Sequence, residues 1–290
     1  MTHRFSAVYL IVVVAIAAAW PVAAQGPRMT PDRLAALAKK PTPKLADGKL
    51  DLNGTWDHLG GIEFVRPQSL EGGSVCVVGC PPAAAAPRGG GAGARAGGPP
   101  PAPPAANFPK YKPEFLAKVK DLSDRQVDTD TALQCQPPGV PRIGPPAKIV
   151  QTGREVIFLY DDISGSFFRI IPTDGRPHRK GLPASYLGDS IGRYEGDTLV
   201  IETVNFNEDT WLTDNGAFHT KDLKVIERLR RVGDTIEYEA VAQDPAVLVE
   251  PWKERTQTLW LSDREIEESP RCEDRDLDLI QDGSHHDNPR

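Results

Sequence analysis

The chain has few of the residues that mark membrane-embedded, nucleic-acid-binding or cysteine-rich proteins. Of its 290 residues, 4 are cysteine, 2 are methionine and 7% are aromatic. Beyond the N-terminus, no apolar run is long enough to span a bilayer. Acidic residues outnumber basic ones by 40 to 34, whereas phosphate binding needs a surplus of Lys and Arg on one face. We therefore expect no integral membrane span and no nucleic-acid partner.

The chain also offers little that points to a common cofactor or metal. No Walker or Rossmann glycine pattern and no H-E-x-x-H motif stands out, and we expect no standard serine hydrolase. His178, His219 and Asp174 could meet only through the tertiary fold, and His285-His286 lies in a polar tail. We predict that the protein binds no metal and no cofactor.

What is present begins with the pattern of a secretory signal peptide at residues 1–24. A short basic start precedes an apolar run at 7–19, and Val22-Ala23-Ala24 forms a small-residue cleavage site. The alternative is a membrane anchor, which the short run and Pro21 disfavour. We therefore predict a periplasmic or secreted protein.

Export bears on the four cysteines, because disulfides persist outside the cytosol. Four cysteines allow three pairings. We favour Cys135–Cys272, which would join the start of the main domain to its end, with Cys76–Cys80 as a local loop. A zinc site is the alternative, which the four-residue spacing and the lack of a nearby histidine disfavour.

Composition divides the rest of the chain into four parts. Residues 25–71 form an N-terminal segment with a first strand. Residues 72–109 are dominated by Ala, Gly and Pro, and we expect a disordered insertion there. An antiparallel β domain is predicted over 110–275, followed by a polar tail at 276–290.

Two hairpins of similar sequence are the clearest elements of the β domain. In each, a Gly-Asp pair lies between strand-like runs, as in a tight two-residue turn. The first hairpin pairs 189–195 with 198–206, and the second pairs 224–231 with 235–243. The repeat is too short to indicate a solenoid.

The remaining pattern completes an all-β prediction. We expect about seven strands between 154 and 262, one more at 50–57, and short helices at 33–40 and 111–128. Sequential strands with tight turns favour an up-and-down antiparallel meander that curves into a lipocalin-like barrel or half-barrel. A two-sheet sandwich is the alternative.

Two resemblances to known families rest on particular residues. Gly54-Thr55-Trp56, at the start of the first strand, resembles the Gly-x-Trp signature of lipocalin-like barrels, in which the Trp plugs the closed end and the cavity holds small apolar ligands. The stretch Thr173 to His178, followed by Tyr186 to Thr203, is similar to a family of uncharacterised exported bacterial proteins. That resemblance covers nearly all of 130–275 and implies a compartment but no reaction.

This second resemblance has one departure that bears on function. Relatives often carry a histidine where this chain has Lys224, so a two-histidine site on that strand is not expected here.

The segment 173–219 is rich in groups that can bind or catalyse. An imidazole beside a carboxylate can act as a general base, and an arginine can hold an anionic oxygen. The candidate catalytic residues are His178, His219, Asp174 and Glu227. The candidate ligand-binding residues are Arg176, Asp189, Arg193, Glu202, Trp211 and Phe168.

Each of these candidates also has a structural interpretation. The Asp-Gly sequences are ordinary turns, and the aromatic residues are equally suited to a core. Strand alternation puts Glu202 and Glu227 among apolar neighbours, where each would need a cationic partner such as Arg193 or Arg228. Such a pair is more often structural than functional.

The function we predict is binding of a small, partly apolar molecule in a cavity whose mouth carries Asp174, Arg176, His178 and His219. The alternatives are a cofactor-independent isomerase, lyase or hydrolase with a His/Asp pair, and a purely structural envelope protein. Water-accessible histidines converging on one concavity would favour catalysis, whereas an apolar cavity with a buried ion pair would favour binding. Oligomeric state and ligand identity stay open.

Overall fold

The computed structural model describes residues 29–58, 68–69, 75–76, 107–162 and 164–268. The predicted signal peptide, most of the predicted insertion, Cys80, Cys272 and the tail lie outside these residues. The chain divides into two units, 1–36 and 37–290. Of the first unit, residues 29–36 are described, and they contain most of helix α2 (Pro31–Ala38).

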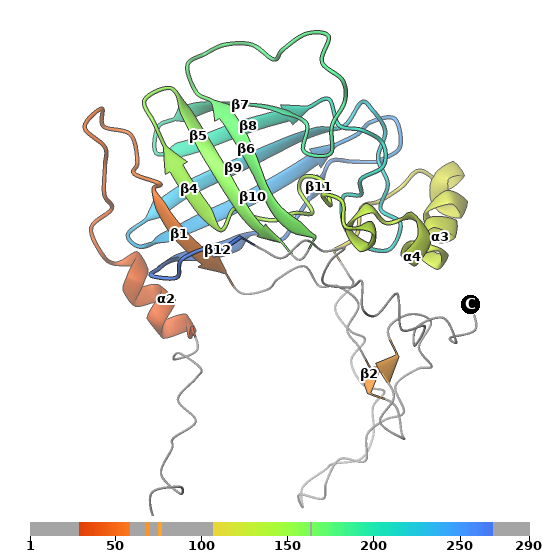
Figure 1. Cartoon of the computed structure of the whole chain (residues 1–290), viewed down its shortest axis with the longest axis horizontal. Coiled ribbons are helices and arrows are strands. Elements are labelled where there is room, and N and C mark those ends of the chain that lie inside the picture. The colour runs from red at the N-terminus through yellow and green to blue at the C-terminus, as the bar shows by residue number, and fades with distance from the viewer. Residues whose placement is uncertain (1–28, 59–67, 70–74, 77–106, 163, 269–290) are drawn as a thin grey trace, which may run out of the picture. The chain divides into compact units, whose positions relative to one another are not determined.

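The second unit contains a nearly closed, barrel-shaped antiparallel sheet, as predicted (Figure 1). In spatial order its strands are β6 (Gly165–Pro172), β5 (Glu155–Asp162), β4 (Lys148–Gln151), β1 (Gly54–His58), β12 (Gln257–Ser262), β10 (Thr235–Gln243), β9 (Lys224–Val232), β8 (Thr198–Val204) and β7 (Asp189–Glu195). The short strand β11 (Trp252–Lys253) pairs with β10, and β2 (Gln68–Ser69) pairs with β3 (Val75–Cys76). The sandwich alternative was wrong.

Both predicted hairpins are confirmed. β7 pairs with β8, and β9 pairs with β10, each around a Gly-Asp turn at the expected place. Gly196 and Gly233 both have a φ of 59°, which explains why glycine stands at these positions. The third hairpin, β5–β6, spans the expected turn near 163.

Sheet order departs from a simple meander at two places. β1 inserts between β4 and β12, so it joins two runs of sequential strands, and the sequence pattern did not predict β4. β6 and β7 follow each other along the chain but form the two free edges of the sheet. Eight antiparallel pairings separate them, so these edges run parallel and need a long connection.

The two free edges meet along what we call the seam. Among the described residues, no backbone hydrogen bond joins β6 to β7. Side chains close the seam instead: a Cβ atom added to Gly192 would lie only 3.0 Å from Thr173 Cγ2 and 3.1 Å from Ile171 Cγ2. The barrel is therefore held together here by packing and side-chain bonds.

The barrel core is apolar and includes the tryptophan of the Gly-x-Trp sequence. Trp56 is fully buried, donates its indole N–H to Leu52 O at 3.0 Å, and has the Arg231 guanidinium 5.0 Å from its ring centre. Arg231 also donates to Gly233 O at 2.8 Å, so this buried cation is satisfied. Trp56 is thus central to the core.

The predicted helix at 111–128 is divided into short pieces. These are η1 (Pro113–Phe115), α3 (Leu116–Asp124) and α4 (Gln126–Thr129), followed by η2 (Thr131–Gln134). No helix in the described part of the chain is both long and apolar enough to cross a membrane.

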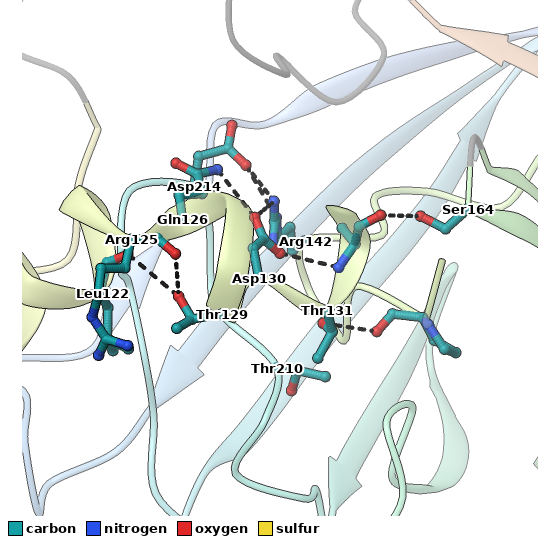
Figure 2. A network of polar contacts seen from close by, with 12 residues as sticks. Leu122, Arg125, Gln126, Thr129, Asp130, Thr131, Arg142, Ser164, Thr210 and Asp214 are labelled. Atoms are coloured by element: carbon teal, nitrogen blue, oxygen red, sulfur yellow. Dashed lines mark hydrogen bonds and ion pairs between the residues drawn. The ribbon is translucent and has the colours of Figure 1, made fainter. Parts of the chain in front are cut away.

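A buried ion pair fixes this helical region (Figure 2). The Arg142 guanidinium donates to both Asp130 oxygens at 2.6 and 2.7 Å, and to Asp214 Oδ1 at 2.7 Å. Gln126 Nε2 donates to Asp130 at 3.0 Å. Asp130 and Arg142 are almost fully buried. Their contacts join α4 and η2 to the loops that carry Arg142 and Asp214.

Candidate functional site: a cleft over the barrel seam

A cleft of about 480 Å³ lies over the seam between β6 and β7. We call it the seam cleft. Its lining comprises Pro137, Glu155, Phe168, Arg169, Ile170, Pro172, Arg176, Pro177, Arg179, Ser185, Tyr186, Leu187, Gly188, Asp189, Ser190 and Ile191. Its volume and its largely apolar lining with a few charged groups are typical of sites for small molecules.

Strand alternation explains the apolar floor of the seam cleft. Arg169 and Ile171 of β6 point into the barrel and are buried. Phe168 and Ile170 therefore point outward, and they stay 63% and 50% exposed. Two large exposed apolar side chains in one hollow are unusual for a surface and suit an apolar ligand.

Beneath the seam cleft, one buried arginine connects five strands. The Arg169 guanidinium donates to Glu227 Oε1 at 3.0 Å and Oε2 at 2.6 Å, and to the hydroxyls of Tyr160, Ser190 and Thr203 at 3.0, 2.9 and 2.8 Å. These residues lie on β6, β9, β5, β7 and β8. The arginine therefore bridges the seam that backbone bonds leave open.

Glu227, a predicted catalytic residue, belongs to this network. It is fully buried, and its Oε1 also accepts from the Tyr238 hydroxyl at 3.0 Å. Burial raises the pKa of Tyr160 and of Tyr238, so both phenols stay protonated. With both oxygens engaged, Glu227 is a structural anion; its cationic partner is Arg169, not the predicted Arg193 or Arg228.

Arg169 was missed by sequence reasoning, although a signal was present. It lies between Phe168 and Ile170 in an apolar strand, on the face of Ile171. An arginine on the inward face of a strand needs a buried anion, and Glu227 was already predicted to be a buried anion in need of a cation.

Arg176, a predicted ligand-binding residue, lines the seam cleft. Its Nε donates to Asp174 Oδ1 at 2.8 Å, and Arg154 donates to the same carboxylate at 3.3 Å. These bonds, that of Arg176 first, hold the pKa of Asp174 well below its ordinary value. Asp174, a predicted catalytic residue, is therefore a stable anion that anchors Arg176.

Asp189 anchors a second arginine that the sequence reasoning did not identify. Arg179 Nε donates to Asp189 Oδ1 at 2.8 Å, and both residues line the seam cleft. Burial alone would raise the pKa of Asp189, but the hydrogen bonds from Arg179 and His178 outweigh it and lower the pKa. Asp189 thus carries a charge that fixes both the arginine and the histidine.

His178 lies beside the seam cleft but does not face into it. Its Nδ1 is 2.9 Å from Asp189 Oδ2, and its Nε2 is 3.4 Å from Glu202 Oε1. Nε2 is inaccessible to solvent. The ring therefore lies between two carboxylates and connects the 173–188 loop to β7 and β8.

Glu202 lies on the outer face of β8, opposite the inward-facing Glu227. Lys224 Nζ donates to its Oε2 at 3.1 Å. Burial opposes ionisation of Glu202, yet the bond from Lys224 and the proximity of His178 outweigh it and lower the pKa. Lys224 therefore serves as the cation of this pair.

His219 and Trp211 do not line the seam cleft. His219 is 2% exposed; its Nε2 is 2.8 Å from the Thr210 hydroxyl, and its Nδ1 is 2.9 Å from Thr220 O. The carbonyl can only accept, so Nδ1 carries a proton and Nε2 accepts from Thr210. Burial lowers the pKa of His219, so the ring is neutral. Trp211 is also buried, in the core.

Arg193 is likewise outside the seam cleft. It lies on the outer face of β7, half exposed, and its Nε donates to Glu195 at 3.0 Å. Of the ten predicted site residues, the seam cleft contains Phe168, Arg176 and Asp189, and its charged contacts add Asp174, His178 and Glu227. The predicted convergence of both histidines at one mouth does not occur among the cleft-lining residues.

The sequence Gly188 to Gly192 spells G-x-S-x-G, which sequence reasoning overlooked. In serine hydrolases that motif forms a sharp strand-to-helix turn with an exposed serine. Here it leads into strand β7, and Ser190 is buried and bonded to Arg169 and Thr203. It is not a nucleophile elbow.

Within the described residues, no three His, Cys, Asp or Glu side chains are grouped so that they could hold a metal ion. Of the four cysteines, only Cys135 has a described side chain, so the disulfide pairing stays a prediction.

The fold and this site define a class: a nearly closed antiparallel β-barrel with an amphipathic cleft over its seam. Comparison of the chain with models of known protein families, with curated proteins and with solved structures found no match. The resemblance to the uncharacterised exported bacterial proteins therefore stays a prediction.

Proposed function

We propose that the protein binds a small, partly apolar molecule in the seam cleft. The observation that carries this proposal is the cleft itself, in which exposed Phe168 and Ile170 lie opposite a loop with two anchored arginines. A ligand with an apolar body would cover the two exposed side chains, which water otherwise solvates unfavourably.

The positions of the two histidines support binding rather than catalysis, because neither offers a nitrogen to the seam cleft. His219 has both nitrogens bonded, and His178 has its Nε2 buried against Glu202. A general base must reach a substrate proton within hydrogen-bonding distance. The seam cleft instead combines apolar walls with the buried Arg169–Glu227 pair beneath it, the arrangement expected of a binding site.

We further propose that binding takes place outside the cytosol. This rests on the signal-like pattern of residues 1–24. Secretion of the full chain by an export-competent host, with removal of that segment as measured by intact mass, would support it; retention of the segment in the cytosol would contradict it.

The binding proposal is tested by a ligand-observed NMR screen of small fragments against the wild-type protein and Ile170→Trp. Ile170 is half exposed in the seam cleft, so the larger side chain fills the site without disturbing the core. We expect fragments that bind the wild type to bind Ile170→Trp at least about tenfold more weakly.

Val249→Trp is the matched control, because Val249 is an exposed aliphatic residue that does not line the cleft. It should bind the same fragments as the wild type. Fragments that bind Ile170→Trp as tightly as the wild type, or a screen in which nothing binds, would contradict a binding function for this cleft.

A further inference from the structure

We infer that the ligand of the seam cleft carries a carboxylate, which Arg176 and Arg179 bind. The inference rests on the proposed binding function and adds the chemical class of the ligand. It depends on how each guanidinium is anchored and on which of its N–H groups remain free.

Each arginine is fixed on one side and open on the other. Arg176 uses Nε and Nη2 to bind Asp174, and Arg179 uses Nε to bind Asp189. A guanidinium has five N–H donors, so each keeps at least three that bind no described residue. Both side chains are partly exposed, at 47% and 66%.

Anchoring on an aspartate prepares these arginines for an anion. A free arginine loses rotamer freedom when it binds, whereas one already held by a carboxylate loses less. The open edge of a guanidinium matches the two oxygens of a carboxylate and can donate to both. The two open edges therefore provide the polar half of the site.

The charges around the cleft nearly cancel, so they accommodate at most a single negative charge on the ligand. Asp174 is shared between Arg176 and Arg154, which leaves one cation in excess there, and Arg179 is balanced by Asp189. Glu155 also lines the cleft and would repel an anion. A doubly charged phosphate is disfavoured by this near-neutral balance, whereas a monocarboxylate is accommodated.

The apolar half of the site is adjacent to these donors in the same cleft. Phe168 and Ile170 lie on its floor, and Tyr186 and Leu187 come from the loop that also carries the two arginines. The ligand class that fits both halves is an apolar aliphatic or aryl body that ends in one carboxylate.

The test uses 2-naphthylacetic acid and its neutral, nearly isosteric amide, titrated by calorimetry into the full-length protein after removal of its signal. We expect the acid to bind wild type at least about tenfold more tightly than the amide. Arg179→Gln and Arg176→Gln should each abolish most of that preference. Their affinity for the amide should change much less than their affinity for the acid, because the amide carries no charge for the arginines to bind.

Two further variants decide the source of the effect. Arg193→Gln removes an exposed arginine that is also paired with a carboxylate but lies outside the cleft, and it should keep the preference. Glu155→Gln removes a like charge from the cleft and should strengthen binding of the acid. Weaker binding of the acid would show that the bound carboxylate does not lie near Glu155 and the two arginines, and it would overturn the inference.

Equal binding of acid and amide would show that the cleft binds apolar molecules without reading their charge, so the inference would be wrong and the proposed function would stand. If neither probe binds while the binding of neutral fragments still depends on Ile170, the inference is likewise wrong and the proposed function stands. If no molecule binds in a way that depends on Ile170, the inference and the proposed function are both wrong.

Discussion

At the scale of single residues, the fully buried Glu227 and the partly buried Glu254 differ in how their carboxylate oxygens are bonded. Glu227 forms an ion pair with Arg169, and both of its carboxylate oxygens accept hydrogen bonds. Glu254 accepts one bond, from Gln257 Nε2 at 3.2 Å, and its Oε2 has no partner in the described part of the chain. The first is a structural ion pair, whereas the second is kept neutral by burial.

Replacing Arg169 with methionine should destabilise the protein by about 3–5 kcal/mol, because Glu227 would be left buried without a cation. The free energy of unfolding in urea measures this. Arg230→Met is the control, since Arg230 and Glu237 form an exposed pair worth roughly 1 kcal/mol or less. A loss of similar size in both variants would mean that the network does not hold the seam.

Burial raises the pKa of Glu254 to about 8, and the like charge of Glu227 adds to the effect. The unfolded chain ionises near the ordinary value of 4.5. The contribution of Glu254 to stability is therefore greatest below that pH, and this contribution decreases by up to about 1.4 kcal/mol per pH unit until the folded group ionises near 8.

Glu254→Gln should remove this dependence, so its thermal midpoint should exceed that of wild type at pH 8 by more than at pH 5. Scanning calorimetry across this range measures both. Parallel pH profiles for the two proteins would show that Glu254 is solvated.

At the scale of elements, the 173–188 loop is positioned at its middle and at its C-terminal end. His178 and Arg179 hold its middle through Asp189, and Gly188 joins it to β7. Gly188 has a φ of +68°, and a Cβ there would lie 2.7 Å from Val204 O and 2.8 Å from Thr203 Cγ2. The glycine is therefore needed for both backbone conformation and space.

Gly188→Ala should destabilise the protein by roughly 2–4 kcal/mol, since it combines a positive φ with a clash against backbone. Gly175→Ala has a similar φ of +83° but open space around it, and should cost only about 1 kcal/mol. Chemical denaturation of both variants separates the clash from the backbone strain. Equal losses would show that the loop adjusts to the methyl group.

Elements with short-range determinants were predictable, and those without were not. The β7–β8 and β9–β10 hairpins follow from alternation and a Gly-Asp turn, which neighbouring residues specify. β4 has only four residues and no turn signature, and it exists because β1 and β5 pair with it. Its formation depends on partners that lie elsewhere in the sequence.

At the scale of the whole molecule, the barrel is closed in two ways. β1 bridges the two runs of strands by hydrogen bonds, and the seam is closed by the Arg169 network and by packing at Gly192. A nine-strand antiparallel path brings its edges together parallel, so the β6–β7 connection must run back along the barrel, from the end of β6 to the opposite end where β7 begins. That connection forms a wall of the cleft.

A disulfide between Cys135 and Cys272 would add a covalent link between distant parts of the chain. If it is present, reduction should lower the thermal midpoint, because a loop of this length contributes on the order of several kcal/mol. Calorimetry with and without reductant measures it, and Cys135→Ala should show the same midpoint under both conditions. An unchanged wild-type midpoint would contradict this pairing.

The sequence alone determined the fold class and the two hairpins, because alternation and turn chemistry act between near neighbours. Three of the candidate residues line the cleft: Arg176 and Asp189 were chosen by chemical type within 173–219, and Phe168 was chosen as an aromatic residue that could line a pocket.

Tertiary structure alone decided which side chains meet. It paired Glu227 with Arg169 across 58 positions, turned Glu202 outward, buried His219 and brought Phe168 beside Arg176. The physical reason is register: pairing of distant strands fixes which face of each strand is inside, and a shift of one residue would exchange the two faces.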